Sequence, residues 1–159
     1  DTYSHTVRKV VVATAVVTTL AGTAGIVGGR DGTGPAALFY YPRGLALDSA
    51  GNLYVADSGS RTVRKVVVAT GVVTTLAGQA GVGGSADGSG STALFSSPQG
   101  LALDGAGNLY VADIYNHTIR KVVVAIRAWR RRSFASCARW RRKIRRRGCS
   151  FCTRSPSGC

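Results

Sequence analysis

Cysteine, tryptophan and glutamate are missing from the first 125 residues of this 159-residue chain, and methionine is missing throughout. Without cysteine, these residues depend on no disulfide for their stability. No run of about 18 apolar residues occurs, so we expect no membrane-spanning helix. The chain also does not open on a basic and then apolar segment, so a secretory signal peptide is not indicated.

Charge divides the chain into two unlike parts. Residues 1–125 hold nine Lys or Arg against seven Asp and are therefore close to neutral. Residues 126–159 hold the other twelve basic residues, all four cysteines and both tryptophans, and no acidic residue. The net charge of +14 thus describes this C-terminal tail (126–159) rather than the chain as a whole.

A repeat with a period of 56 residues runs through the first part of the chain. The segment 42–69 returns at 98–125 with 21 of 28 positions identical. The sequence Val-Val-Thr-Thr-Leu-Ala-Gly at 16–22 returns at 72–78, and Thr6–Val10 has counterparts at 62–66 and 118–122. Self-similarity at one fixed period indicates a repeat architecture.

One period predicts four short strands separated by turns. The strands expected at 44–48, 53–56, 62–68 and 72–76 are rich in β-branched residues, and Gly and Asn favour a turn before the second of them. Four strands in a unit of about 40–55 residues is the arrangement of a β-propeller blade. We therefore expect an all-β propeller fragment with a partial blade at 1–41, a full blade at 42–97 and a partial blade at 98–125, followed by a disordered or weakly helical tail.

The repeated unit resembles the NHL repeat. The segment 98–122 matches it best, reading Pro-Gln-Gly-Leu-Ala-Leu-Asp-Gly-Ala-Gly-Asn-Leu-Tyr-Val-Ala-Asp-Ile-Tyr-Asn-His-Thr-Ile-Arg-Lys-Val, whereas Ser60 and Arg61 replace Asn-His in the copy at 42–66. The outer segment Val-Val-Thr-Thr-Leu-Ala-Gly and the glycine-rich sequence after it are similar to the long NHL units of teneurin-type propellers. The resemblance implies a ring of about six blades. The chain is thus expected to be a fragment or a truncated product, with further blades of a parent propeller as partners.

Four aspartates end predicted strands, at Asp48, Asp57, Asp104 and Asp113. They are candidates for a ring of Ca²⁺ ligands near the propeller axis. They are also the residues expected to accept backbone N–H groups in the turn that follows each strand, and we favour this structural interpretation. No metal and no cofactor is therefore predicted.

His5 and His117 share one repeat position, which Arg61 occupies in the middle copy. A catalytic base needs an oriented partner, and no such partner is evident, so these side chains are interpreted as structural. The resemblance includes metal-dependent propeller enzymes such as lyases and lactonases. With two histidines and no glutamate in the chain, the lyase activity is not carried over, and no catalytic residue is predicted.

The turns at 57–61 and 113–117 differ most between the copies, and loops on a rigid scaffold are common recognition sites. The predicted binding residues are Ser58, Ser60, Arg61, Tyr115, Asn116 and His117. The glycine-rich stretches 22–34 and 78–90 are expected to be surface loops. The function predicted from these features is a non-catalytic interaction or scaffold module for a protein or another macromolecular ligand, with RNA binding by a propeller face as the alternative.

The tail leaves three hypotheses open. The first is nucleic-acid binding, because basic side chains neutralise phosphates and aromatic rings stack on bases. Its candidate residues are Arg130, Arg131, Arg132, Trp140, Arg141, Arg142 and Lys143. The second is a zinc site, for which only Cys149 and Cys152 have the usual spacing. The third, which we favour, is out-of-frame sequence, because the repeat breaks off within a blade at residue 126.

Overall fold

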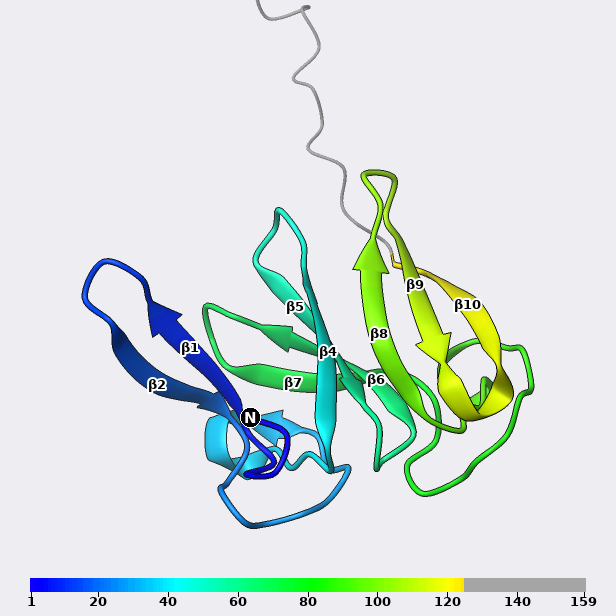
Figure 1. Cartoon of the computed structure of the whole chain (residues 1–159), viewed down its shortest axis with the longest axis horizontal. Coiled ribbons are helices and arrows are strands. Elements are labelled where there is room, and N and C mark those ends of the chain that lie inside the picture. Colours follow the sequence, from blue (N-terminus) through cyan, green and yellow to red (C-terminus); the bar gives the residue numbers. More distant parts are fainter. Residues whose placement is uncertain (125–159) are drawn as a thin grey trace, which may run out of the picture. The chain divides into compact units, whose positions relative to one another are not determined.

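The computed structural model describes residues 1–124, which form three antiparallel sheets in chain order (Figure 1). The predictions for the tail fall on residues 125–159 and lie outside the described residues. Short 3₁₀ helices occur at Gly34–Ala36, Gly90–Thr92 and Ile114–Asn116. None of the helices in the described part is long and apolar enough to cross a membrane. The all-β prediction is confirmed.

The middle sheet contains a complete four-stranded blade. Its strands are β4 (Pro42–Leu47), β5 (Asn52–Asp57), β6 (Thr62–Val67) and β7 (Val72–Ala77). Each strand pairs with the next one along the chain, so that Tyr54 faces Lys65 and Lys65 faces Thr74. The predicted strand positions agree with these bounds to within two residues.

The flanking sheets are parts of equivalent blades. The first sheet pairs β1 (Val7–Val11) with β2 (Val16–Ala21), which correspond to β6 and β7. The third sheet contains β8 (Pro98–Leu103), β9 (Asn108–Asp113) and β10 (Thr118–Val123), which correspond to β4, β5 and β6. The described residues therefore contain one full blade between two partial ones.

The first glycine-rich loop contains a strand that the sequence did not predict. β3 (Gly32–Thr33) pairs with Val72 and Val73 on the outer edge of β7 and makes the middle sheet five-stranded. The N–H of Gly34 extends this pairing by donating to the carbonyl of Gly71 at 2.9 Å. The expectation that 22–34 is only a surface loop is thus wrong at Gly32–Thr33, because this segment closes the outside of the neighbouring blade.

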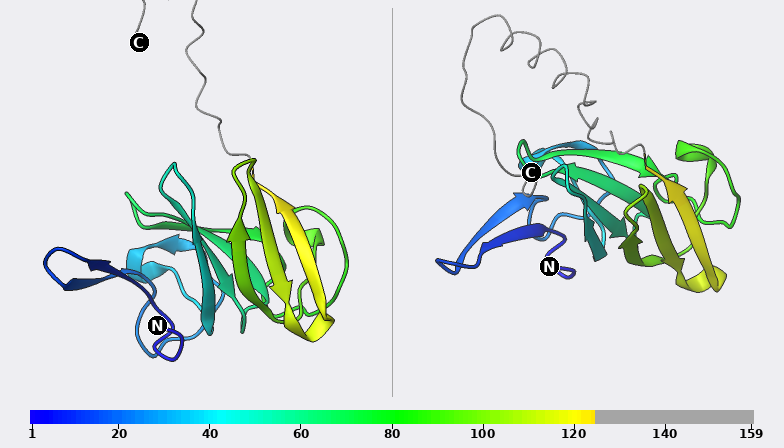
Figure 2. Two further views of the ribbon diagram at one scale, coloured as in Figure 1. Left: turned by 45° about the horizontal axis from the view of Figure 1, so that its top comes forward. Right: turned by 90° about the horizontal axis from the view of Figure 1, so that it is seen from above.

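Two apolar clusters hold the sheets together, and they use the same repeat positions. The first contains Phe39 and joins the first and middle sheets, and the second contains Phe95 and joins the middle and third sheets. Figure 2 shows the three sheets fanning out side by side. Burying one phenylalanine stabilises a fold by about 1.5–3 kcal/mol. The sheets are thus stacked by their faces, as in a propeller.

Apolar side chains remain uncovered at the far end of the described stack. Ile119 on β10 is 71% exposed, whereas its counterpart Val63 in the middle blade is fully buried. Val63 is covered by the third sheet, and none of the residues 1–124 provides an equivalent cover for Ile119. The face of β10 is therefore suited to contact a further blade.

Candidate functional site

The turn aspartates Asp48 and Asp104 have the structural role that the sequence predicts. Asp48 accepts the N–H groups of Ala50 at 2.9 Å and Asn52 at 2.8 Å. Asp104 accepts the N–H groups of the equivalent residues, Ala106 and Asn108. Hydrogen bonds from the side chain and backbone of Asn108 lower the pKa of Asp104 to about 2. Both carboxylates are thus engaged by their own turns.

Tyrosines in β5 and β9 reach back to these turns. The hydroxyl of Tyr54 donates to Asp48 Oδ2 at 3.1 Å, and that of Tyr110 donates to Asp104 Oδ2 at 3.3 Å. Burial and the neighbouring carboxylate raise the pKa of Tyr54 to about 12. Tyr54 is buried between the middle and third sheets, so its ring packs in the core and is not a ligand platform.

Asp57 ends β5 but does not accept the N–H groups of the following turn, so the turn interpretation is wrong for this residue. Asp57 accepts the N–H of Tyr40, which precedes β4, and pairs with Arg64 Nη1 at 3.1 Å. Both side chains are fully buried. Burial raises the pKa of Asp57 to about 6, although the bonds from Tyr40 and Arg64 act in the opposite direction.

Arg64 joins three separate segments of the chain. Its Nη2 donates to Asp31 Oδ1 at 2.7 Å, and its remaining hydrogen bonds go to the carbonyls of Arg30 and Leu38. Burial alone would raise the pKa of Asp31, but hydrogen bonds from Thr75 and the contact with Arg64 hold it below its usual value. The buried guanidinium therefore fixes the loop that carries Asp31 to the middle blade.

The third sheet repeats this arrangement in a more open form. Arg120 donates to the carbonyls of Leu94 and Ala86 and pairs with Asp87. Asp113 accepts the N–H groups of Ser96 and Ser97, as Asp57 accepts that of Tyr40. Asp113 therefore also accepts backbone N–H groups from the chain before its blade, and the following turn contributes a hydrogen bond only through the side chain of Asn116. Within residues 1–124, no group of three or more His, Cys, Asp or Glu is placed to hold a metal ion.

The shared histidine position has a backbone explanation. His5, Arg61 and His117 all have a positive φ, between 54° and 60°. The left-handed conformation is uncommon for a residue with a side chain, and here it ends the turn that leads into β1, β6 or β10. The repeat therefore needs this conformation, which His and Arg both adopt here.

The six predicted binding residues divide into buried and exposed members. The hydroxyls of Ser58 and Ser60 are buried and donate to the carbonyls of Pro98 and Gly28, and Asn116 donates to Gly84 and Asp113. Arg61 donates to the carbonyl of Gly81. Tyr115 is 73% exposed, and His117 is also exposed. Ligand binding by these residues stays a prediction.

An aromatic cluster beside the turn 57–61 was missed by the sequence prediction. It consists of Tyr3, His5, Tyr40 and Tyr41. Tyr40 stacks on Tyr41 with ring centroids 4.7 Å apart, and His5 lies edge-on at 5.0 Å from Tyr41. Tyr3 lies at 6.1 Å from Tyr41, and 84% of its surface is exposed.

Two features hold the aromatic cluster in place. The Nδ1 atom of His5 accepts the N–H of Tyr41 at 3.2 Å, and Tyr41 itself has a positive φ of 52°. Gly59 leaves room for Tyr40, because a Cβ atom at Gly59 would lie 2.5 Å from the Tyr40 ring. The third sheet has Ser96 and Ser97 at the positions of Tyr40 and Tyr41, so the repeat itself does not require these rings.

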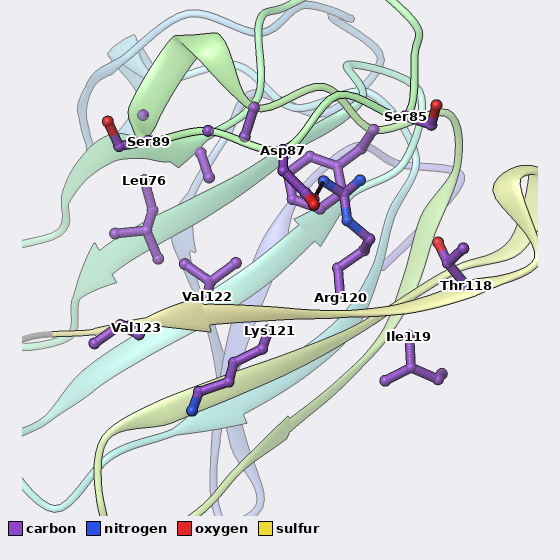
Figure 3. Close-up of a pocket in the computed structure, with 15 residues that line it drawn as sticks. Leu76, Ser85, Asp87, Ser89, Thr118, Ile119, Arg120, Lys121, Val122 and Val123 are labelled. Atoms are coloured by element: carbon purple, nitrogen blue, oxygen red, sulfur yellow. Dashed lines mark hydrogen bonds and ion pairs between the residues drawn. The ribbon is translucent and has the colours of Figure 1, made fainter.

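A cavity of about 680 Å³ lies beside β10 at the other end of the described stack (Figure 3). Arg120 and Val122 point toward the loop that carries Asp87, whereas Ile119 and Lys121 point away from that loop (Figure 3). The corresponding space in the middle blade is filled by β7. This cavity is thus the place of an outer strand and is distinct from the aromatic cluster.

The family model for the NHL repeat matches residues 39–66 and 95–122. The chain is an NHL-repeat protein. Each match includes the first three strands of a blade, the arginine that we find paired with aspartate and the residue with positive φ before the third strand. The resemblance drawn from the repeated motif is therefore confirmed.

Relatives of this NHL-repeat protein are much longer than the chain. It is 35% identical to human NHL repeat-containing protein 2 over 76% of the chain and 18% of that protein. It is also 35% identical to a probable peptidyl-alpha-hydroxyglycine alpha-amidating lyase of Caenorhabditis elegans over 50% of the chain and 21% of the lyase. A crystal structure of a Bacteroides thetaiotaomicron protein of unknown function superposes with a TM-score of 0.72 at 31% identity, covering 78% of the chain and 31% of that protein.

Proposed function

We propose that this NHL-repeat protein is a non-catalytic interaction module that binds a segment of a partner protein on the aromatic cluster. The observation that carries the proposal is a difference between the two equivalent residue pairs that precede the middle blade and the third sheet. Tyr40 and Tyr41 precede the middle blade, whereas Ser96 and Ser97 precede the third. Since serine satisfies the fold at this position, the tyrosines are free to serve recognition.

The chemistry of the cluster supports a protein ligand. Tyrosine supplies a large contact area and one hydroxyl with few rotatable bonds, and it is enriched at protein interfaces. Tyr3 and Tyr40 are exposed, whereas His5 holds the backbone of Tyr41 and Gly59 leaves room for Tyr40. Such a platform suits an extended segment with an apolar or cationic side chain that packs on the rings.

The test compares the full chain with variants that copy its own repeat. A random peptide library is selected on the immobilised full chain, at a salt concentration high enough to screen the basic tail. The selected peptides are then titrated onto Y40S/Y41S, which installs the residues found at 96 and 97, and onto Y115S as the matched control.

We expect Y40S/Y41S to weaken binding at least about tenfold, because a tyrosine at the centre of an interface contributes on the order of 2 kcal/mol. We expect Y115S to bind as the unchanged chain does. Equal binding by Y40S/Y41S and the unchanged chain would reject the proposal. So would a library from which the unchanged chain selects no peptide.

A further inference from the structure

β7 lies between two strands, β6 and β3, and we call the space that it occupies between them a slot. One edge pairs with β6 and the other with β3, so that Val73 faces both Val66 and Gly32. The N–H and the hydroxyl of Thr75 both donate to Asp31, at 3.0 and 2.9 Å. The sequence of the strand in this slot is Val-Val-Thr-Thr-Leu-Ala.

The third sheet contains the same slot, and no strand of residues 1–124 fills it. β10 pairs only with β9 among the described strands and differs from β6 at one residue, Ile119 in place of Val63. The loop 85–90 forms the opposite wall. It is anchored by the hydrogen bond from the Gly78 N–H to the carbonyl of Gly90 at 3.0 Å. In the middle blade, the Gly22 N–H donates to the carbonyl of Gly34 in the same way, at 3.1 Å. The cavity of about 680 Å³ lies between these walls (Figure 3).

The groups that bind β7 in the middle blade are available in this second slot. The side chain of Asp87 is 95% exposed, whereas that of its counterpart Asp31, which binds Thr75, is 49% exposed. The N–H of Gly34 donates to Gly71, but no acceptor for the N–H of Gly90 exists within residues 1–124. Phe95 and Val122 provide an apolar lining. The slot therefore offers a strand edge, a carboxylate and an apolar floor.

We propose that the slot between β10 and the loop 85–90 accepts one extended strand of the Val-Val-Thr-Thr-Leu-Ala type from a different protein rather than from a second copy of this chain. Addition of a strand to an open sheet edge combines main-chain hydrogen bonds with pockets for alternate side chains. The sequence that continues the chain at 126–133 reads Ile-Arg-Ala-Trp-Arg-Arg-Arg-Ser and lacks the uncharged, β-branched pattern of β2 and β7. The matching donor is therefore the outer strand of a similar blade.

The proposal is tested with a labelled peptide of the sequence Ala-Thr-Gly-Val-Val-Thr-Thr-Leu-Ala-Gly, taken from residues 69–78, added to the full chain. Fluorescence anisotropy measures its affinity, and hydrogen exchange shows where it binds. We expect saturable binding and slower exchange of the β10 amides that do not bond to β9. A peptide with proline in place of the residue taken from Thr74 is the matched control, because proline removes a main-chain donor from the strand.

Two further variants test the role of Asp87. D87N is expected to bind the peptide about tenfold more weakly, since the acceptor for the residue taken from Thr75 loses its charge. The charge-matched control D1N, at the residue that pairs with Arg8 of the first sheet, should bind as the unchanged chain does. A peptide with valine in place of the residue taken from Thr75 should lose affinity for the unchanged chain and much less for D87N.

Several outcomes would overturn the proposal. These are the absence of binding, binding without protection of β10, and equal affinity for the proline peptide. Protection of the outer β10 amides before peptide is added would assign the slot to the chain's own tail. Protection that increases with protein concentration would assign it to a second copy. The slot and the aromatic cluster are independent, because Y40S/Y41S should bind this peptide normally.

Discussion

The ion pair between Arg64 and Asp57 makes the strongest prediction about stability. Replacing Arg64 with methionine keeps much of the apolar volume but removes four hydrogen bonds and leaves Asp57 buried without its counter-charge. Breaking a buried pair from one side costs about 3–5 kcal/mol. We therefore expect R64M to lower the free energy of unfolding by about that amount.

R120M is the matched control for this prediction. Arg120 occupies the same repeat position, but 12% of its side chain is exposed, and its partner Asp87 is almost fully exposed. Its second partner, Asp113, is 3.9 Å away and keeps hydrogen bonds from Ser96 and Ser97. We expect R120M to cost about 1–2 kcal/mol, because exposed ion pairs contribute little.

Urea unfolding followed by far-ultraviolet circular dichroism measures both variants. The double variant R64M/D57N should recover part of the loss, since it removes the buried charge that R64M leaves behind. The reasoning would be refuted if R64M cost no more than R120M. It would also be refuted if R64M/D57N were less stable than R64M.

Three further predictions follow from the same contacts. Burial raises the pKa of Asp57 in the folded chain to about 6, above the reference value of 3.8, so the folded chain binds this proton more tightly than the unfolded chain does. The free energy of unfolding should therefore fall as the pH rises from about 4 to 6, and D57N should remove that slope. G59A should lower the free energy of unfolding by about 1–3 kcal/mol in thermal unfolding and weaken binding of the selected peptide, because the added Cβ meets the Tyr40 ring and carbonyl. An unchanged peptide affinity would show that the position of this ring does not matter for binding. Replacing Arg130, Arg131 and Arg132 with alanine should weaken salt-sensitive binding to single-stranded DNA in a filter assay and leave the selected peptide's affinity unchanged, and a loss of peptide affinity would place that site in the tail.

The sequence predicted the strands because each one is a local pattern. Runs such as Val-Val-Thr-Thr at 72–75 favour extended structure, and Gly51, with φ of 81°, makes the turn that its sequence indicates. Repetition supported the same strands twice, because one pattern recurs at 42–69 and 98–125. Short-range chemistry was also sufficient for Asp48, which binds N–H groups two and four residues away.

Longer contacts could not be predicted from the same patterns. Arg64 binds carbonyls 26 and 34 residues earlier in the chain, and β3 pairs with a strand about 40 residues later, so both need the stacked blades as context. The aromatic cluster did leave a signal, because Tyr40-Tyr41 stands opposite Ser96-Ser97 in the repeat. These residues lie before the first strand of each blade, outside the turns 57–61 and 113–117 from which the binding residues were predicted.

The central claim is that ligand recognition takes place on the aromatic cluster, and tyrosine-ring NMR tests it most directly. The chain has six tyrosines, of which three belong to the cluster and Tyr54, Tyr110 and Tyr115 do not. With ¹³C-labelled tyrosine in the full chain, adding a library-selected peptide should shift the ring signals of Tyr3, Tyr40 and Tyr41 and leave the other three in place. Shifts confined to Tyr54, Tyr110 or Tyr115, with the cluster signals unmoved, would contradict the claim.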